Sequence, residues 1–154
     1  MPGRPRLLRS ARNDEWMERL GQMTPEQRRA IEWECSRLVA LYANRNDAAD
    51  WTGVAALYAE DGAMTRPTAP DAPVVGRAAI LAAFQARPPR TTRHICSNVV
   101  IEVESETAAR GESAMLLFTA AGAPPLVGSF HDRFVLTAEG WRFAERRGSL
   151  TFES

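Results

Sequence analysis

Few side chains of this sequence can transfer a proton near neutral pH, and their spacing limits the kinds of reaction that they could catalyse. Only two of the 154 residues are histidine, His94 and His131, and imidazole changes its charge between about pH 5 and 8. The two cysteines, Cys35 and Cys96, are too few for a disulfide framework or a four-thiolate zinc site. HxH, HExxH and CxxC spacings are absent, as are Gly-rich phosphate and dinucleotide motifs. The sequence therefore predicts proton transfer that needs no metal and no cofactor.

His94 begins a segment in which apolar and polar residues alternate, and this pattern predicts a strand over His94–Glu104. Strict alternation would divide the strand into two faces. The face of His94 would also carry Cys96, Asn98 and Val100, and the opposite face would carry Ile95, Ser97, Val99, Ile101 and Val103. The second face is apolar enough to need cover, which favours a homodimer.

A second predicted strand, Val127–Leu136, carries Phe130 and Asp132 on a mostly apolar face. Single polar groups in an apolar lining are typical of small-molecule pockets, where they orient the ligand. An unpaired buried carboxylate is costly. We therefore expect Asp132 either to meet Arg66, Arg146 or another cavity group, or to contact the substrate.

Helices precede the strands along the chain. Thr24-Pro25-Glu26-Gln27 is typical of a helix start, and an apolar stripe follows from Ile31 to Tyr42. Asp50 would cap a second, short helix that runs through Tyr58 and ends at a turn, Asp61-Gly62. A third helix is expected over roughly Arg77–Ala86, before two prolines.

Four long strands should follow the helices. They are expected at His94–Glu104, Ala108–Thr119, Val127–Leu136 and Trp141–Phe152. Short links between consecutive strands require antiparallel pairing. The predicted fold class is therefore α+β, with the helices on one face of an antiparallel sheet.

Composition and charge define the broad class. Hydrophobic residues make up 45% and charged residues 25% of the chain, as in a soluble globular protein, and no apolar run is long enough to cross a membrane. Residues 1–23 are expected to form a basic, partly disordered extension, with one domain over 24–154. Beyond residue 12 the chain carries 15 arginines against 19 acids, which gives no footprint for nucleic acid. The start lacks the apolar core of a secretory signal, so a cytoplasmic location is expected.

Four segments of the sequence resemble one family when taken in order. They are LVALYANRNDAADWTGVAALYAEDG, VVGRAAILAAF, TTRHICSNVVIE and VGSFHDRFVLTAEGWRFAERR. Together they resemble the SnoaL-like branch of the nuclear transport factor 2-like superfamily over roughly residues 25–152. The resemblance implies a curved antiparallel sheet wrapped around the first helix, a cone-shaped barrel with an apolar cavity, and a dimer through the convex face.

The resemblance also implies particular site residues. Scytalone dehydratase, bile-acid dehydratases and hexachlorocyclohexane dehydrochlorinase place an Asp after the first helix and a His at the first long strand. The matching positions here are Asp47 and His94, and Tyr42 matches a tyrosine of the bile-acid dehydratases. Two departures concern the substrate: Asn46 stands where scytalone dehydratase has a tyrosine, and the chain has no lysine near Asp47, unlike the dehydrochlorinase.

The resulting hypothesis is a lyase, isomerase or cyclase acting on a small apolar molecule of polyketide, terpenoid or steroid type. His94 would remove a proton, and Asp47 would orient the imidazole and stabilise its charge. Tyr42 or Asp132 would polarise the leaving oxygen or a carbonyl. The pocket would be lined by Trp51, Leu57, Arg66, Asn98, Phe130 and Asp132. Asp47 should raise the pKa of His94 and burial should lower it. The alternative is a non-catalytic binding or scaffolding subunit, like the small subunits of ring-hydroxylating dioxygenases.

Overall fold

The computed structural model describes residues 21–152, so most of the expected extension, residues 1–23, lies outside the described part. The main helix, α2 (Pro25–Asp47), begins at a capping box in which Thr24 and Gln27 satisfy each other's backbone N–H groups. Its buried side is the predicted stripe and includes Leu38, Val39 and Tyr42. The helix ends at Asp47, and this end positions the candidate site.

Two short helices follow α2. Asp50 caps α3 (Trp51–Ala55) by accepting a hydrogen bond from the Gly53 N–H. The third helix, α4 (Arg77–Gln85), buries Ile80 and Phe84. Within residues 21–152, no helix is both long and apolar enough to cross a membrane.

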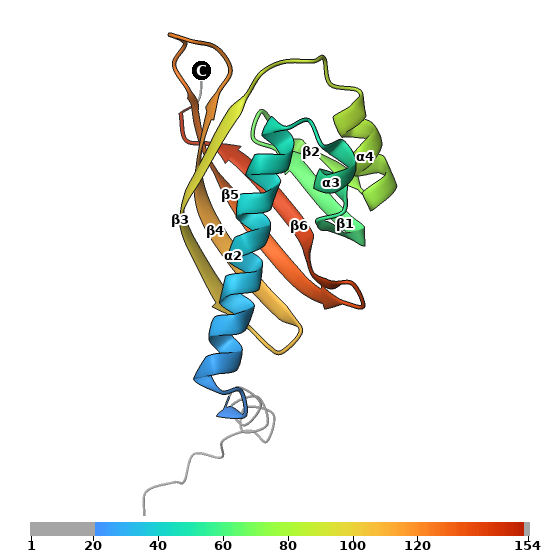
Figure 1. The fold of residues 1–154 in the computed structure, drawn as a ribbon, viewed down its shortest axis with the longest axis vertical. Coiled ribbons are helices and arrows are strands. Elements are labelled where there is room, and N and C mark those ends of the chain that lie inside the picture. Colours follow the sequence, from blue (N-terminus) through green and yellow to red (C-terminus); the bar gives the residue numbers. More distant parts are fainter. Residues whose placement is uncertain (1–20, 153–154) are drawn as a thin grey trace, which may run out of the picture.

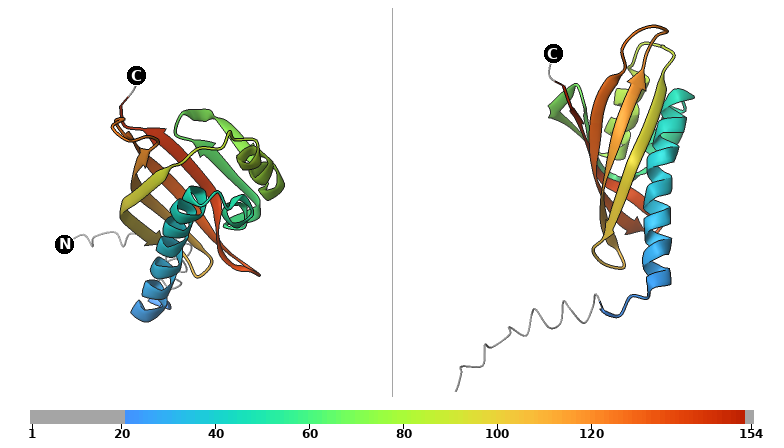
Figure 2. Two further views of the ribbon diagram at one scale, coloured as in Figure 1. Left: turned by 45° about the horizontal axis from the view of Figure 1, so that its top comes forward. Right: turned by 90° about the vertical axis from the view of Figure 1, so that its left-hand side faces the viewer.

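A six-stranded sheet of order β2-β1-β6-β5-β4-β3 lies against the helices, and α2 packs chiefly on β3 (Figure 1). The strands are β1 (Tyr58–Arg66), β2 (Ala69–Val75), β3 (Arg93–Val103), β4 (Ala108–Phe118), β5 (Leu126–Thr137) and β6 (Gly140–Leu150). The sheet is curved, with β2 and β3 as its free edges, and Figure 2 shows α2 along one side of it. The α+β class and the helices on one face are as expected.

The first two strands correct the sequence prediction. The second helix was expected to run through Tyr58 to a turn at Asp61-Gly62. Instead, α3 ends at Ala55, and Asp61 and Gly62 lie inside β1. The β1 strand pairs antiparallel with β2 and parallel with β6, so one pair of the sheet is parallel. Such pairing joins strands far apart in sequence, and the hairpin rule used for consecutive strands does not predict it.

An irregularity in β3 corrects a second prediction. Its register with β4 shifts between Ser97 and Val100, and Asn98 has a φ of 52°. An extra residue of this kind reverses the inside-outside alternation of a strand. Consequently Val99 and Ile101 pack against the core, whereas Val100 is 61% exposed. The apolar outer face expected on β3 is therefore largely absent.

Candidate active site

The structure brings Asp47 and His94 into direct contact. One carboxylate oxygen of Asp47, Oδ1, lies 2.6 Å from His94 Nδ1. The other, Oδ2, accepts the backbone N–H of His94 at 2.9 Å, and the Thr92 hydroxyl donates to Oδ1 at 3.0 Å. These bonds fix the carboxylate at the C-terminal end of α2 and the imidazole at the start of β3. Because Nδ1 is bound to Asp47, Nε2 is the ring nitrogen available to a ligand.

Burial decides the protonation of His94. The side chains of His94 and Asp47 are only 10% and 8% exposed. Burial lowers the pKa of His94, whereas the hydrogen bond and charge of Asp47 raise it; Arg87 and Arg146 lower it further. The net direction is downward from 6.5. The imidazole is thus neutral at pH 7 and able to accept a proton.

His94 lies on the wall of a pocket of about 330 Å³ between α2, the sheet and the segment before β3. This volume is within the range typical of small-molecule sites, roughly 300–1,000 Å³. The wall consists of Tyr42, Met64, Thr65, Arg66, Pro67, Thr68, Arg87, Pro88, Arg90, His94, Met115, Leu117, Leu126 and Phe130. A general base on the wall of an apolar cavity can act on an acidic C–H bond of a bound molecule.

A buried ion pair lies next to the pocket. Arg146 contacts Asp132 with an Nη1–Oδ2 distance of 3.2 Å, and both side chains are 1% exposed. The guanidinium group stacks on the rings of Tyr42, Phe130 and Phe143, with distances of 4.3, 3.8 and 4.7 Å to the ring centroids. Burial raises the pKa of Asp132 to about 6, although Arg146 lowers it. Asp132 thus takes the expected Arg146 partner.

The structure does not bring together every residue expected in the pocket. Tyr42, Arg66, His94 and Phe130 line it, but four others do not, and one of these is Asp132, whose side chain is buried against Arg146. Asn98 is exposed because it is the extra residue of β3. Trp51 stacks on Phe84 with ring centroids 5.5 Å apart, and Leu57 is buried in the core. Both belong to the region where the second helix was predicted too long.

Sequence reasoning missed Arg87, Arg90 and Thr92. Arg87 and Arg90 line the pocket, and Thr92 holds Asp47. The signal available was the segment 87–93, which carries three arginines and no acid directly before His94. Its position in a loop gives it no periodicity, so a search for alternating or helical patterns passes over it.

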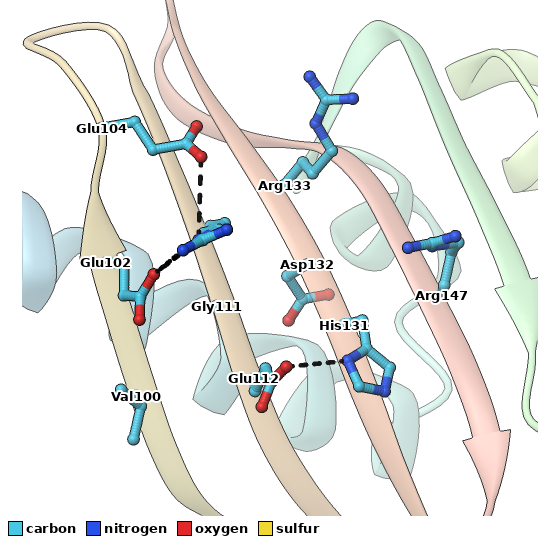
Figure 3. A pocket seen from close by; sticks show the side chains of 10 residues that line it. Val100, Glu102, Glu104, Gly111, Glu112, His131, Asp132, Arg133 and Arg147 are labelled. Carbon is cyan, nitrogen blue, oxygen red and sulfur yellow. Dashed lines mark hydrogen bonds and ion pairs between the residues drawn. The ribbon is translucent and has the colours of Figure 1, made fainter.

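A second hollow, of about 520 Å³, lies on the opposite face of the sheet (Figure 3). Its rim is charged: acids on and beside β3 and β4 lie on one side and arginines on β5 and β6 on the other, and His131 lies 3.4 Å from Glu112. Apart from Asp132, which is buried, the charged side chains of this lining are exposed, and most of them pair with one another: Arg110 with Glu102 and Glu104, and His131 with Glu112. No group of three or more His, Cys, Asp or Glu in residues 21–152 could hold a metal ion, here or elsewhere.

A family model matches this sequence over most of its length. The model for the SnoaL-like domain matches residues 27–147, most of the chain. The chain belongs to the SnoaL-like family. This SnoaL-like domain matches no curated protein sequence significantly.

Solved structures share the fold of this SnoaL-like domain. A proposed scytalone dehydratase from Novosphingobium aromaticivorans is 24% identical, with a TM-score of 0.73 over 84% of this chain and 89% of that one. An NTF2-like protein with a cystatin-like fold from the same species is 23% identical, with a TM-score of 0.71 over 96% and 94%. A hexachlorocyclohexane dehydrochlorinase (LinA Type2) is 15% identical, with a TM-score of 0.74 over 84% and 90%. At these identities the likeness establishes the fold.

Proposed function

We propose that this SnoaL-like domain is an enzyme that removes a proton from carbon in a small, largely apolar, cyclic molecule. The observation that carries the proposal is the 2.6 Å contact between Asp47 and His94 on the wall of a pocket. A carboxylate bound to Nδ1 fixes the tautomer, so that Nε2 carries the lone pair that accepts the proton. The relationship of fold to a proposed dehydratase and a dehydrochlorinase supports the same class of chemistry.

The reaction begins with transfer of the C–H proton to Nε2 of His94. The electron pair of the C–H bond then forms a new carbon–carbon double bond. In an elimination, the leaving group departs with its own electron pair; in an isomerisation, the proton returns to another carbon. Asp47 stabilises the imidazolium through its charge. Tyr42, on the same wall, can donate its hydroxyl proton in a hydrogen bond to the carbonyl or leaving oxygen.

The experiment is a panel of cyclic ketones that carry a β-hydroxyl or β-halide group, or a β,γ double bond. Elimination or isomerisation of each gives a conjugated enone, which absorbs in the ultraviolet. Removal of a positioned general base lowers turnover by roughly 10²–10⁴-fold, so His94→Ala should lose most of the activity. His131→Ala is the matched control because His131 lies on the opposite face of the sheet.

Two outcomes would contradict the proposal. One is full activity of His94→Ala on a substrate that the wild-type protein converts. The other is binding of panel members in the pocket with no conversion of any of them, which would favour the non-catalytic alternative. Folding of each variant is checked by circular dichroism, so that loss of structure is not mistaken for loss of chemistry.

A further inference from the structure

Three arginines line the same pocket as His94. Arg66 is the last residue of β1, and Arg87 and Arg90 lie in the segment between α4 and β3. The wall of the pocket contains no aspartate or glutamate. Three cationic side chains therefore surround a cavity of about 330 Å³ without an acid of the wall to balance them.

None of these arginines forms an ion pair within residues 21–152. Arg66 donates from Nη2 to the carbonyl oxygen of Ala83 at 3.1 Å, and Arg87 donates from Nη1 to Asn46 Oδ1 at 3.3 Å. The Arg66 Nε atom is buried and has no hydrogen-bond partner among the described residues. Buried donors in native proteins are almost always satisfied by protein, water or ligand. These guanidinium groups thus retain donors for a ligand.

The charges of the three arginines also act on one another. Burial lowers the pKa of Arg87, and the positive charges of Arg66 and Arg90 lower it further. Two buried acids beside the pocket are engaged elsewhere, since Asp47 is bonded to Thr92 and His94 and Asp132 is paired with Arg146. A bound anion would relieve this repulsion, whereas a neutral ligand would not.

The apolar residues of the wall indicate what kind of body the ligand has beside its charged group. Met115, Leu117, Leu126 and Phe130 give an apolar surface, which favours a hydrocarbon or aromatic body. The wall contains no glycine and no first turn of a helix, two features that phosphate sites commonly use. The planar guanidinium group matches a carboxylate, which it can bind through two parallel hydrogen bonds.

We propose that the pocket takes a small organic carboxylate with an apolar, ring-containing body, held by Arg66, Arg87 and Arg90. This inference rests on the proposed function in that it names the substrate class for the same site. The arginines would orient the carboxylate away from the apolar wall, so that the ring lies against Phe130 and near His94. They would also stabilise the negative charge that develops as His94 removes a proton from carbon.

The test measures binding alone, by isothermal titration calorimetry of the full chain at low salt. The probes are benzoate and 2-naphthoate, each compared with its neutral amide, benzamide and 2-naphthamide. We expect the carboxylates to bind about tenfold or more tightly than their amides, as for hydrogen bonds to a charged group. The preference should fall about tenfold in Arg87→Gln and several-fold in Arg90→Gln.

The two variants and a control keep the test interpretable. Arg87→Gln also removes the hydrogen bond to Asn46, whereas Arg90 is exposed and can be replaced without loss of packing. Arg29→Gln removes the same charge from an exposed site near the start of α2 and should leave the preference unchanged. Raising the salt concentration should weaken carboxylate binding and leave amide binding unchanged.

A panel in which no carboxylate binds more tightly than its amide would overturn the inference. So would an unchanged preference in both pocket variants. These outcomes are separate from failure of the proposed function. If the wild-type protein shows no preference for carboxylates over amides but its turnover still depends on His94, only the anion site is overturned. A preserved preference with turnover that does not depend on His94 overturns only the proposed function.

Discussion

At the scale of single residues, the site depends on a histidine whose surroundings oppose its charge. Asp47 is in hydrogen-bond contact with His94, yet the pKa of His94 is lowered because burial outweighs the carboxylate and because Arg87 and Arg146 repel a proton. Arg87, one of the three arginines proposed to bind an anionic ligand, therefore also disfavours protonation of His94. In the proposed mechanism, Asp47 would orient the imidazole and stabilise the charge that arises only during proton transfer.

This balance predicts a specific pH dependence. Since the pKa of His94 is lowered from 6.5, activity should rise with pH through a value below 6.5 and be constant around neutrality. Asp47→Asn removes the two contributions that raise the pKa, so the titration of His94 should move to still lower pH. Turnover should nevertheless fall by roughly 10²–10⁴-fold because the imidazole loses its fixed tautomer.

The measurement is an NMR titration of the two histidines, combined with the pH–rate profile of each protein. His131 is exposed on the opposite face of the sheet and serves as the internal reference in the same spectrum. A His94 signal that titrates above that of a model peptide would contradict the prediction. So would an Asp47→Asn protein with wild-type turnover.

At the scale of elements, the Asp132–Arg146 pair joins two neighbouring strands from within the core. Asp132 on β5 and Arg146 on β6 are direct partners in the strand register. Removing one member of a buried ion pair costs about 3–5 kcal/mol, whereas replacing both by apolar groups is often close to neutral. Arg146→Met should therefore lower the free energy of unfolding by about 3–5 kcal/mol, and Asp132→Leu/Arg146→Met by less. Urea denaturation measures both variants.

The raised pKa of Asp132 adds a pH signature to this pair. Its pKa of about 6 exceeds the ordinary value of 3.8 for this carboxyl, so the folded state binds a proton more readily than the unfolded state. The contribution of this group to stability is complete below pH 3.8 and is lost as pH rises through about 6. The difference in unfolding free energy between wild type and Asp132→Asn isolates this dependence; an unchanged difference across this window would contradict it.

The accuracy of the sequence prediction differs among the elements. The bounds of α2, α4 and the four later strands follow from a capping box, two prolines and long alternating runs, all of which are local signals. β1 was missed because Asp61-Gly62 has the composition of a turn, and its parallel pairing with β6 depends on contacts distant in sequence. Asn98 was misplaced because the extra residue in β3 leaves no mark in an alternating pattern.

The site residues divide in the same way, into those that have a signal in the sequence and those that have none. Asp47 and His94 were found through their resemblance to a family motif, and Asp132 was found because a carboxylate on an apolar strand needs a partner. The direction of the His94 pKa was left open, because it depends on how deeply the pair is buried. Arg87 and Arg90 were missed because a loop without periodicity carries them, and only the folded chain brings them beside Arg66.

At the scale of the whole molecule, the outer face of the sheet remains the expected surface for a second copy. Val99 and Ile101 do not contribute to this face, since both pack against the core. The outer face instead exposes Ile95 and Val100, at 47% and 61%. Around the hollow of Figure 3, the acids on and beside β3 and β4 lie on one side together with Arg110, and Arg133 and Arg147 of β5 and β6 lie on the other. Under a two-fold rotation, such a surface is complementary to itself.

We therefore expect a dimer in sedimentation equilibrium that weakens as salt is raised, because ion pairs would cross the interface. Arg133→Glu should weaken the dimer further by placing a negative charge among the acids of the partner, at a cost of about 1 kcal/mol or more. Arg37→Glu changes an exposed charge on α2 instead and should leave association unaltered. A monomer at high protein concentration in low salt would contradict this expectation.

The extra residue at Asn98 changes which residues of β3 point toward the core. On the side of His94, even-numbered residues point inward; beyond Asn98, odd-numbered residues do. Deleting this one residue would force a choice between turning the imidazole toward solvent and turning Val99 and Ile101 outward. The half of β3 before Asn98 carries His94, and the half after it closes the core. Each half can therefore change its residues without disturbing the other, but the number of residues between them cannot change by one.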